Sequence, residues 1–383
     1  MTQAVLTLNA GSSSVKFALF GVAGDRPLAT GIADRIGPDG TLRLNGGDGR
    51  VLAAGGHDLT SHAGAITAAI ASFGAAFPDL ALRAVGHRVV HGGAHHAGPV
   101  RVTDRVLAEL RALAAFAPLH QPHNLAGIEA ATRAFAGVPQ VACFDTAFHR
   151  GQPWINETFA LPRQFHDDGV RRYGFHGLSY EFIAGVLPAD VARGRVVVAH
   201  LGNGASMCAM VAGRSVASTM GFSALDGLAM GTRCGQIDPG VLLYLMDHKQ
   251  MNAAQIADLL YRQSGLLGLS GISNDMRILQ ASDAPEAAQA IGYFVERCRR
   301  EVASLAAAMG GIDALVFTGG IGENAGTVRA GVCSGLGWMG VALDAARNAA
   351  GVGVISQEGA GVRVLVIPTN EELVIARAAR AVA

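Results

Sequence analysis

Features that would assign this chain to several common classes of protein are missing from its sequence. Basic and acidic residues balance at 30 each, for a net charge of +0, and no run of Lys or Arg occurs. Because nucleic acids and anionic membranes attract basic patches, neither is predicted as a partner. No apolar run approaches 18 residues, and the first residues lack a basic segment followed by an apolar one, so we expect a soluble, cytoplasmic protein.

Paired cysteines are also missing. The five cysteines lie far apart, their number is odd, and none belongs to a Cys-x-x-Cys pair: Cys143, Cys208, Cys234, Cys298 and Cys333. Such a set is typical of reduced thiols in a cytosolic protein. Lysine is scarce as well, since only Lys16 and Lys249 occur among the 30 basic residues. A lysine inside a turn therefore hints at a need for a compact ammonium group.

The sequence does contain enough apolar material for two cores. A chain of 383 residues, of which 50% are hydrophobic, exceeds the usual size of one domain, so two domains are expected. Strand-like and helix-like runs alternate, which is the α/β pattern. Predicted strands span residues 5–8, 15–20, 84–90, 140–144, 196–201, 206–211, 314–318 and 362–367. Predicted helices span 104–116, 124–135, 179–187, 238–248, 285–309 and 371–382, with caps expected at Asp104, Asn124, Asp238 and Asn370.

The stretch TLNAGSSSVKFALF, residues 7–20, has the composition of a phosphate-binding loop but not the order of a P-loop. A P-loop places two glycines ahead of Lys-Ser/Thr and then a helix, whereas here one glycine and three serines lead into an alternating apolar run. The pattern predicts strand, tight polar turn, strand. The turn is either a phosphate site, built from backbone N–H groups, hydroxyls and the Lys16 ammonium, or an ordinary hairpin turn.

Two further glycine-rich turns follow later in the chain. Residues 196–206, VVVAHLGNGAS, repeat the design of strand, Asn/Gly/Ser turn and second strand. The two hairpins predict two domains on one plan, whose turns hold a phosphate chain in a cleft between them; the alternative is coincidence in a chain with 51 glycines. Residues 317–324, FTGGIGEN, follow a strand and open a helix, and form either a nucleotide site or a tight strand–helix turn.

Histidines and an arginine gather in GHRVVHGGAHH, residues 86–96. A zinc site is one interpretation, but the stretch has no Cys, Asp or Glu and no HExxH unit, so Arg88 is the stronger candidate. Its guanidinium, at the end of a strand, would bind a carboxylate or phosphoryl group at two points, or form a surface ion pair.

Single carboxylates stand at the ends of two other strands. Asp145 could handle a magnesium ion or a proton, and Glu371, which opens the last helix, could bind metal or complement the helix dipole. His176 and Arg233 lie in glycine-flanked turns, which allow either close approach of a ligand or buried hydrogen bonding.

Together these motifs resemble the acetate kinase family of the acetokinase group, within the superfamily of sugar kinases, Hsp70 and actin. The resemblance covers the whole chain and rests on NAGSSSVKF, HRVVHGG, APLH, FDTAFH, RRYGFHG, HLGNGAS, MGTRCG, SNDMR, FTGGIGEN and IPTNEEL in family order. It implies an α/β fold of two similar ribonuclease H-like domains with a cleft between them. Residues 1–147 with 369–383 would hold the acid and metal, and residues 148–368 the nucleotide.

The implied activity is reversible phosphorylation of acetate by ATP, giving acetyl phosphate and ADP, by direct in-line transfer in a homodimer. Mg²⁺ would be the metal, with Mn²⁺ as an alternative, held by Asn9 and Glu371. Arg88 would bind the substrate carboxylate. The pocket for the methyl group would be formed by Val90, Leu119 and Phe175.

The resemblance also implies catalytic and nucleotide-binding residues. Asp145 would be the acid/base residue, and His176 and Arg233 would stabilise the transition state. Because acetate is already ionised at neutral pH, we expect Asp145 mainly to orient groups. The nucleotide would be contacted by Ser12, Ser14, Lys16, His200, Leu201, Gly202, Asn203, Gly204, Asp275, Met276, Arg277, Gly320, Ile321, Gly322, Glu323 and Asn324.

The chain departs from the family pattern near the methyl pocket. Ala224 stands where family members often have a proline, and the smaller residue adds room for about one methylene, worth about 1–3 kcal/mol of discrimination. Propionate therefore stays open as a substrate. Gln236 and the run 120–124, which lie near functional turns, also differ from the family. Two other classes of function are alternatives: a conformational ATPase of the actin or Hsp70 kind, and a histidine-metal hydrolase.

Overall fold

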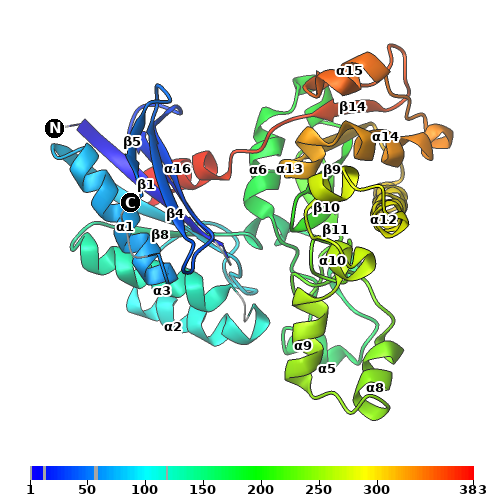
Figure 1. The fold of residues 1–383 in the computed structure, drawn as a ribbon, viewed down its shortest axis with the longest axis horizontal. Helices are drawn as coiled ribbons and strands as arrows, with labels where there is room; N and C mark the ends of the chain where they lie inside the picture. Colours follow the sequence, from blue (N-terminus) through cyan, green and yellow to red (C-terminus); the bar gives the residue numbers. More distant parts are fainter. Residues whose placement is uncertain (1, 12–13, 56–58, 118–119) are drawn as a thin grey trace. The chain divides into compact units, whose positions relative to one another are not determined.

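The computed structural model describes residues 2–11, 14–55, 59–117 and 120–383, so Ser12 and Leu119, two of the predicted site residues, lie outside the described residues. Contacts divide the chain into two compact units (Figure 1). Unit 1 comprises Met1–Arg150 and Asn370–Ala383, and unit 2 comprises Gly151–Thr369. Each unit is built on one mixed sheet with helices, which confirms the predicted α/β class. Among the described residues, no helix is long and apolar enough to cross a bilayer.

Unit 1 contains a sheet with the strand order β5-β4-β3-β2-β1-β6-β8-β7. Its strands are β1 (Thr2–Ala10), β2 (Val15–Gly21), β3 (Pro27–Asp34), β4 (Thr41–Gly46), β5 (Val51–Ala54), β6 (Leu80–Val89), β7 (Val100–Arg101) and β8 (Gln140–Phe144). β1, β2 and β3 run antiparallel, whereas β1, β6 and β8 are parallel. Parallel strands place their carboxyl ends at one edge of the sheet, where ligands of open α/β sheets commonly bind.

Helices pack on both faces of this sheet. They are α1 (His62–Ala76), α2 (Asp104–Ala112), η1 (Leu113–Phe116), α3 (Gln121–Ala134), η2 (Ala147–His149) and α16 (Glu371–Val382). Leu6 and Leu8 of β1 share a core with Ile66 of α1. Gly86 of β6 is the register partner of Thr7, so it faces away from α1. On that other face of the sheet, Gly86 lies against α16. The start of α16 is therefore carried by the sheet whose strands end at Asn9 and Arg88.

Unit 2 repeats the plan of unit 1, with the strand order β11-β10-β9-β12-β14-β13. Its strands are β9 (Arg195–Leu201), β10 (Ala205–Val211), β11 (Arg214–Ser218), β12 (Ala314–Thr318), β13 (Gly353–Val354) and β14 (Arg363–Val366). β9, β10 and β11 run antiparallel, and β9, β12 and β14 are parallel. The order β3-β2-β1-β6-β8 thus recurs as β11-β10-β9-β12-β14. This recurrence confirms the two predicted hairpins, and coincidence between glycine-rich turns does not explain it.

The helices of unit 2 include one long helix against its sheet. They are α4 (Trp154–Glu157), α5 (Arg163–Asp167), α6 (Gly177–Val186), α7 (Ala189–Ala192), α8 (Pro239–Asp247), α9 (Ala253–Arg262), α10 (Gly265–Ser270), α11 (Met276–Gln280), α12 (Pro285–Met309), α13 (Gly319–Asn324), α14 (Gly326–Ser334), η3 (Gly337–Met339) and α15 (Ala345–Ala350). α12 packs against β9, β10 and β11. It starts at a proline and ends before Gly310, whose backbone is left-handed, as expected for helix boundaries.

Two of the four predicted helix caps are correct. The side chains of Asp238 and Asn370 accept backbone N–H bonds at the starts of α8 and α16. The prediction for Asp104 is wrong by one position, because the Thr103 hydroxyl caps α2. The prediction for Asn124 is wrong as well: α3 begins three residues earlier, and this side chain is buried in bonds to other segments.

Candidate active site

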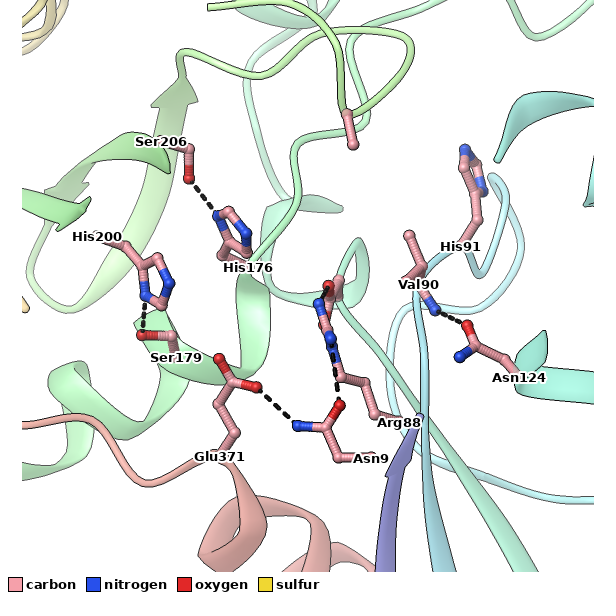
Figure 2. Close-up of polar contacts among 12 residues, drawn as sticks. Asn9, Arg88, Val90, His91, Asn124, His176, Ser179, His200, Ser206 and Glu371 are labelled. Atoms are coloured by element: carbon pink, nitrogen blue, oxygen red, sulfur yellow. Dashed lines mark hydrogen bonds and ion pairs between the residues drawn. The ribbon is translucent and has the colours of Figure 1, made fainter. Parts of the chain in front are cut away.

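Asn9 and Arg88 (Figure 2) meet Asp145 at the carboxyl ends of β1, β6 and β8. The Asp145 N–H donates to Val89 O at 3.1 Å, which continues the pairing of β6 with β8. Arg88 Nε and Nη2 donate to the two carboxylate oxygens of Asp145 at 3.0 and 2.6 Å. Arg88 Nη1 donates to Asn9 Oδ1 at 3.2 Å. Side-chain exposure is 16% for Arg88 and 2% for Asp145, so the pair is largely buried rather than on the surface.

Arg88 still has donors for a ligand. The bonds among the described residues use three of its five N–H groups, which leaves one N–H on Nη1 and one on Nη2. A guanidinium with two N–H groups left can donate both of them to one carboxylate. Burial lowers the pKa of Arg88, but the carboxylates of Asp145 and Glu371 outweigh that effect and the net pKa is raised. The guanidinium is therefore a permanent cation.

A pair of oxygen-bearing side chains beside Arg88 fits a magnesium ion. Glu371 opens α16 behind its Asn370 cap, and Asn9 Nδ2 donates to Glu371 Oε2 at 3.3 Å (Figure 2). Burial raises the pKa of Glu371, while Arg88 lowers it. The described residues contain no cluster of three or more His, Cys, Asp or Glu side chains able to hold a metal. One carboxylate and one amide oxygen, completed by water and phosphate, is a usual donor set for Mg²⁺.

The serine turn connects β1 to β2 beside this pair. Lys16 is the register partner of Asn9, so both side chains emerge on the same face of the sheet. Gly11 N donates to Ser14 O at 2.8 Å, which links the end of β1 to the start of β2. The strand–turn–strand arrangement is confirmed. Contacts of Lys16 and Ser14 with a phosphate stay predictions.

Asn124 joins two strand ends of unit 1. Its Oδ1 accepts from Val90 N at 3.0 Å, and its Nδ2 donates to Ala10 O at 2.9 Å (Figure 2). Val90 is two residues from Arg88, and Ala10 is next to Asn9. The Asn124 amide therefore holds together the two segments that carry Arg88 and Asn9. Val90 is buried in unit 1 and Phe175 is buried in unit 2. Their placement around a methyl group stays a prediction.

His176 of unit 2 stands just before α6 with a left-handed backbone, at φ 58°. This conformation is uncommon outside glycine and marks functional sites often enough to be informative. Its Nδ1 lies 2.8 Å from Ser206 Oγ, and its ring stacks on that of His200 at 4.4 Å between centroids (Figure 2). A Cβ on Gly204 would lie 3.3 Å from His176 Nε2 and 3.9 Å from Arg233 Nη1. Both nitrogens therefore border the turn at residues 200–204.

The loop that carries Arg233 packs directly on that turn. Gly231 N donates to Asn203 O at 2.9 Å, and a Cβ on Gly231 would fall 1.9 Å from Asn203 Oδ1, so a larger residue there would displace the Asn203 side chain. Arg233 Nη1 donates to Ala224 O at 2.9 Å. The backbone of the segment that departs from the family thus positions this guanidinium.

A pocket of about 690 Å³ lies between the turn 200–204, α11 and α13 in unit 2. Its volume is within the range of small-molecule sites. Eight of the predicted nucleotide residues line it: Gly202, Asn203, Asp275, Met276, Arg277, Gly320, Ile321 and Asn324. Asn274, Gln280 and Ala325 line it too and were not predicted. Asn274 belongs to the SNDMR motif, from which only the three residues after it were chosen, whereas Gln280 and Ala325 lie outside every motif. His200, Leu201, Gly204, Gly322 and Glu323 do not line it.

Two residues support α13 beside the pocket. The Glu323 carboxylate accepts from Gly319 N at 2.9 Å and from Thr369 N at 3.3 Å, so it is bound to backbone; its nucleotide contact stays a prediction. Arg329 is almost fully buried and donates to Gly322 O and Glu323 O at 2.9 and 2.8 Å. Burial lowers the pKa of Arg329. Sequence reasoning missed this arginine, because nothing in a helical pattern separates a buried arginine from an exposed one.

The fold thus defines a class of protein with two α/β units that follow one strand plan, each with a hairpin turn of small residues between its first two strands. The sequence profile of the acetokinase family matches residues 4–377. The chain therefore belongs to the acetokinase family, as its motifs predicted.

Relatives and solved structures agree with this assignment. The chain is 57% identical to the acetate kinase of Methylocella silvestris over 98% of this chain and 97% of that one. It is 54% identical to the acetate kinase of Rhodopseudomonas palustris over 98% of both chains. The acetate kinase of Porphyromonas gingivalis has a similar structure, with a TM-score of 0.88, 37% identity and 99% coverage of both chains. A propionate kinase from Francisella tularensis gives a TM-score of 0.91 at 35% identity, with 100% coverage of both.

Proposed function

We propose that this protein is an acetate kinase, which transfers the γ-phosphoryl group of ATP to acetate and forms acetyl phosphate and ADP, reversibly. The observation that best supports this proposal is the similarity, over 98% of the chain, to relatives named acetate kinase at 57% and 54% identity. The geometry agrees, because a paired arginine with two N–H groups to spare suits a small carboxylate substrate. A conformational ATPase or a histidine-metal hydrolase has no comparable support.

Arg88 binds the acetate carboxylate in this proposal. Its side-on edge is occupied by Asp145, so the substrate uses the end of the guanidinium that faces away from that carboxylate. Asp145 then orients Arg88 and keeps it in place, and no proton needs to move, because acetate is already an anion. The transfer is direct and in line, with an acetate oxygen as the nucleophile.

Asn9 and Glu371 hold Mg²⁺, or Mn²⁺ as the alternative, together with phosphate oxygens and water. The bound ion neutralises phosphate charge, as it does in other phosphoryl transfers. Lys16 lies beside Asn9 in the sheet register and supplies a second cation. The nucleoside occupies the pocket of about 690 Å³ in unit 2.

His176 and Arg233 stabilise the transition state. A transferring phosphoryl group spreads negative charge over its equatorial oxygens, so fixed donors and cations aimed at it lower the barrier. His176 Nε2 and Arg233 Nη1 both border the turn 200–204, of which Gly202 and Asn203 line the pocket.

We expect hydroxylamine trapping to give acyl hydroxamate from ATP, Mg²⁺ and acetate, with a lower kcat/KM for propionate and a much lower one for butyrate. Acetate offers about four heavy atoms, which bounds its binding at about −6 kcal/mol, or tens of micromolar. Real binding is weaker than this bound, so we expect a millimolar KM. A preference for propionate would instead establish the propionate kinase alternative, which Ala224 favours. Absence of acyl phosphate from every acid would contradict the kinase assignment.

We also propose that the protein forms a homodimer in the cytoplasm. α8 buries none of its residues although Val241, Leu243, Tyr244 and Met246 are apolar, and Leu243 is 62% exposed. Such a patch is typical of an interface. No disulfide joins any of the five cysteines, all of which lie among the described residues, and this agrees with a reducing compartment.

The dimer has a direct test. Leu243→Asp places a charge in the apolar patch, so we expect at least a hundredfold weaker self-association by light scattering during size-exclusion chromatography. Val352→Asp, at an exposed valine away from α8, is the matched control and should leave the dimer intact. A wild-type monomer at micromolar concentration, or a dimer unaffected by Leu243→Asp, would contradict this interface.

A further inference from the structure

His176 is connected through a serine hydroxyl to a buried tyrosine. Ser206 Oγ lies 2.8 Å from His176 Nδ1 and 2.5 Å from the Tyr180 hydroxyl oxygen. Ser206 belongs to β10 and Tyr180 to α6, so strand and helix each contribute one hydroxyl. Neither Ser206 nor Tyr180 has measurable solvent exposure, whereas the other ring nitrogen, Nε2, faces the turn at Gly204.

One arrangement of the hydrogens satisfies both contacts in sequence: Tyr180 donates to Ser206, and Ser206 donates to His176. Burial raises the pKa of Tyr180 well above its usual range, so the phenol keeps its proton and can donate to Ser206 Oγ. A hydroxyl that accepts one bond still has a single hydrogen to donate. In this arrangement Ser206 donates that hydrogen to His176 Nδ1, which is unprotonated and accepts it. In a neutral imidazole the remaining proton sits on Nε2.

We propose that Tyr180 and Ser206 are positioning residues that hold His176 neutral with its proton on Nε2, so that Nε2–H donates to the transferring phosphoryl group. The last clause rests on the proposed kinase function; the tautomer does not. His176 thereby acts as a fixed dipolar donor beside the cation Arg233. The loop backbone, the stack on His200 and the Ser206 contact together fix the direction of the donor.

The neighbouring histidine provides an internal comparison. His200 Nδ1 lies 2.8 Å from the hydroxyl of Ser179, the residue next to Tyr180 on α6 (Figure 2). α6 therefore supplies one hydroxyl to the hydrogen bonds of each stacked histidine: Ser179 for His200, and Tyr180, through Ser206, for His176. Ser179→Ala removes one ring contact of the same length without touching that of His176, and it is the matched control.

The tautomer can be read directly by ¹⁵N NMR of the full-length protein labelled at its 13 histidines, with His176→Gln used for assignment. We expect a pyridine-type Nδ1 and a pyrrole-type Nε2 signal for His176 at pH 8. Ser206→Ala and Tyr180→Phe should move both signals toward the average of exchanging tautomers, Ser206→Thr should restore them, and Ser179→Ala should leave them unchanged. A pyrrole-type Nδ1 in the wild type, or signals unmoved by Ser206→Ala, would overturn the proposal.

Kinetics provide the second readout. Ser206→Ala should lower kcat about 10-fold with little change in either KM, because the donor is misplaced in only part of the molecules. A fall in kcat with unchanged His176 signals would mean that Ser206 is merely structural, which also overturns the proposal. If the wild type makes no acyl phosphate while the NMR signals behave as expected, the kinase function fails and the tautomer assignment stands.

Discussion

Arg233→Ala is expected to lower kcat about 10²–10³-fold while both KM values change by no more than a few-fold. The guanidinium borders the turn 200–204 at Gly204 and is held by Ala224 O, so it is placed before substrate arrives. A donor of this kind acts on charge that develops during transfer, and removing one typically costs that much in turnover. The measurement is steady-state acyl hydroxamate formation with acetate and ATP varied separately.

Two companion variants separate this role from the alternatives. Arg233→Lys should recover only part of the loss, because an ammonium group cannot keep the Ala224 bond and reach the phosphoryl group in the same geometry. Arg262→Ala, which removes an exposed arginine on α9, should behave as the wild type. An increase in the KM for ATP at constant kcat would assign Arg233 to ground-state nucleotide binding, and a wild-type kcat would remove it from catalysis.

The regular elements of this fold could be predicted because their patterns are local. β8, β12, α12 and α16 have the bounds that the sequence predicts. β3 could not be predicted in this way, since PLATGIAD begins with proline and contains a glycine; it forms because β2 offers it an open edge. Asn124 was mistaken for a cap for a related reason. Its partners are 34 and 114 residues away, and only the tertiary structure brings them to it.

The candidate site also has features that a local pattern predicts and features that only the tertiary structure creates. Arg88 and Asp145 are charged residues at the ends of strands, and His176 lies in a glycine-flanked turn. These local features mark each of them as a functional candidate. The ion pair between Arg88 and Asp145 depends on the register of β6 against β8, and neither segment carries that register alone. The hydroxyls of Ser206 and Tyr180 resemble those of any strand and helix until the backbone places them around one imidazole.

Arg88→Ala is expected to lower the thermal midpoint of unfolding by about 10 °C and to abolish turnover of acetate. The change leaves the Asp145 carboxylate, which is 2% exposed, without its counter-charge. Removing one partner of a buried pair costs about 3–5 kcal/mol, and a domain of this size shifts by about 2–4 °C per kcal/mol. Arg111→Ala is the matched control. Arg111 and Glu129 are also 2.6 Å apart, but their exposures are 56% and 36%, so the midpoint should fall by no more than about 2–4 °C.

The double variant Arg88→Ala with Asp145→Asn separates stability from activity. If the loss of stability comes from a stranded carboxylate, neutralising that carboxylate should recover about half of the fall in the midpoint. Turnover of acetate should not return, because the N–H groups proposed to bind the substrate are still missing. Midpoint losses that simply add would show that the two side chains are energetically independent. Recovery of turnover in the double variant would show that Arg88 serves only to neutralise Asp145, and that the acetate carboxylate is bound by other groups.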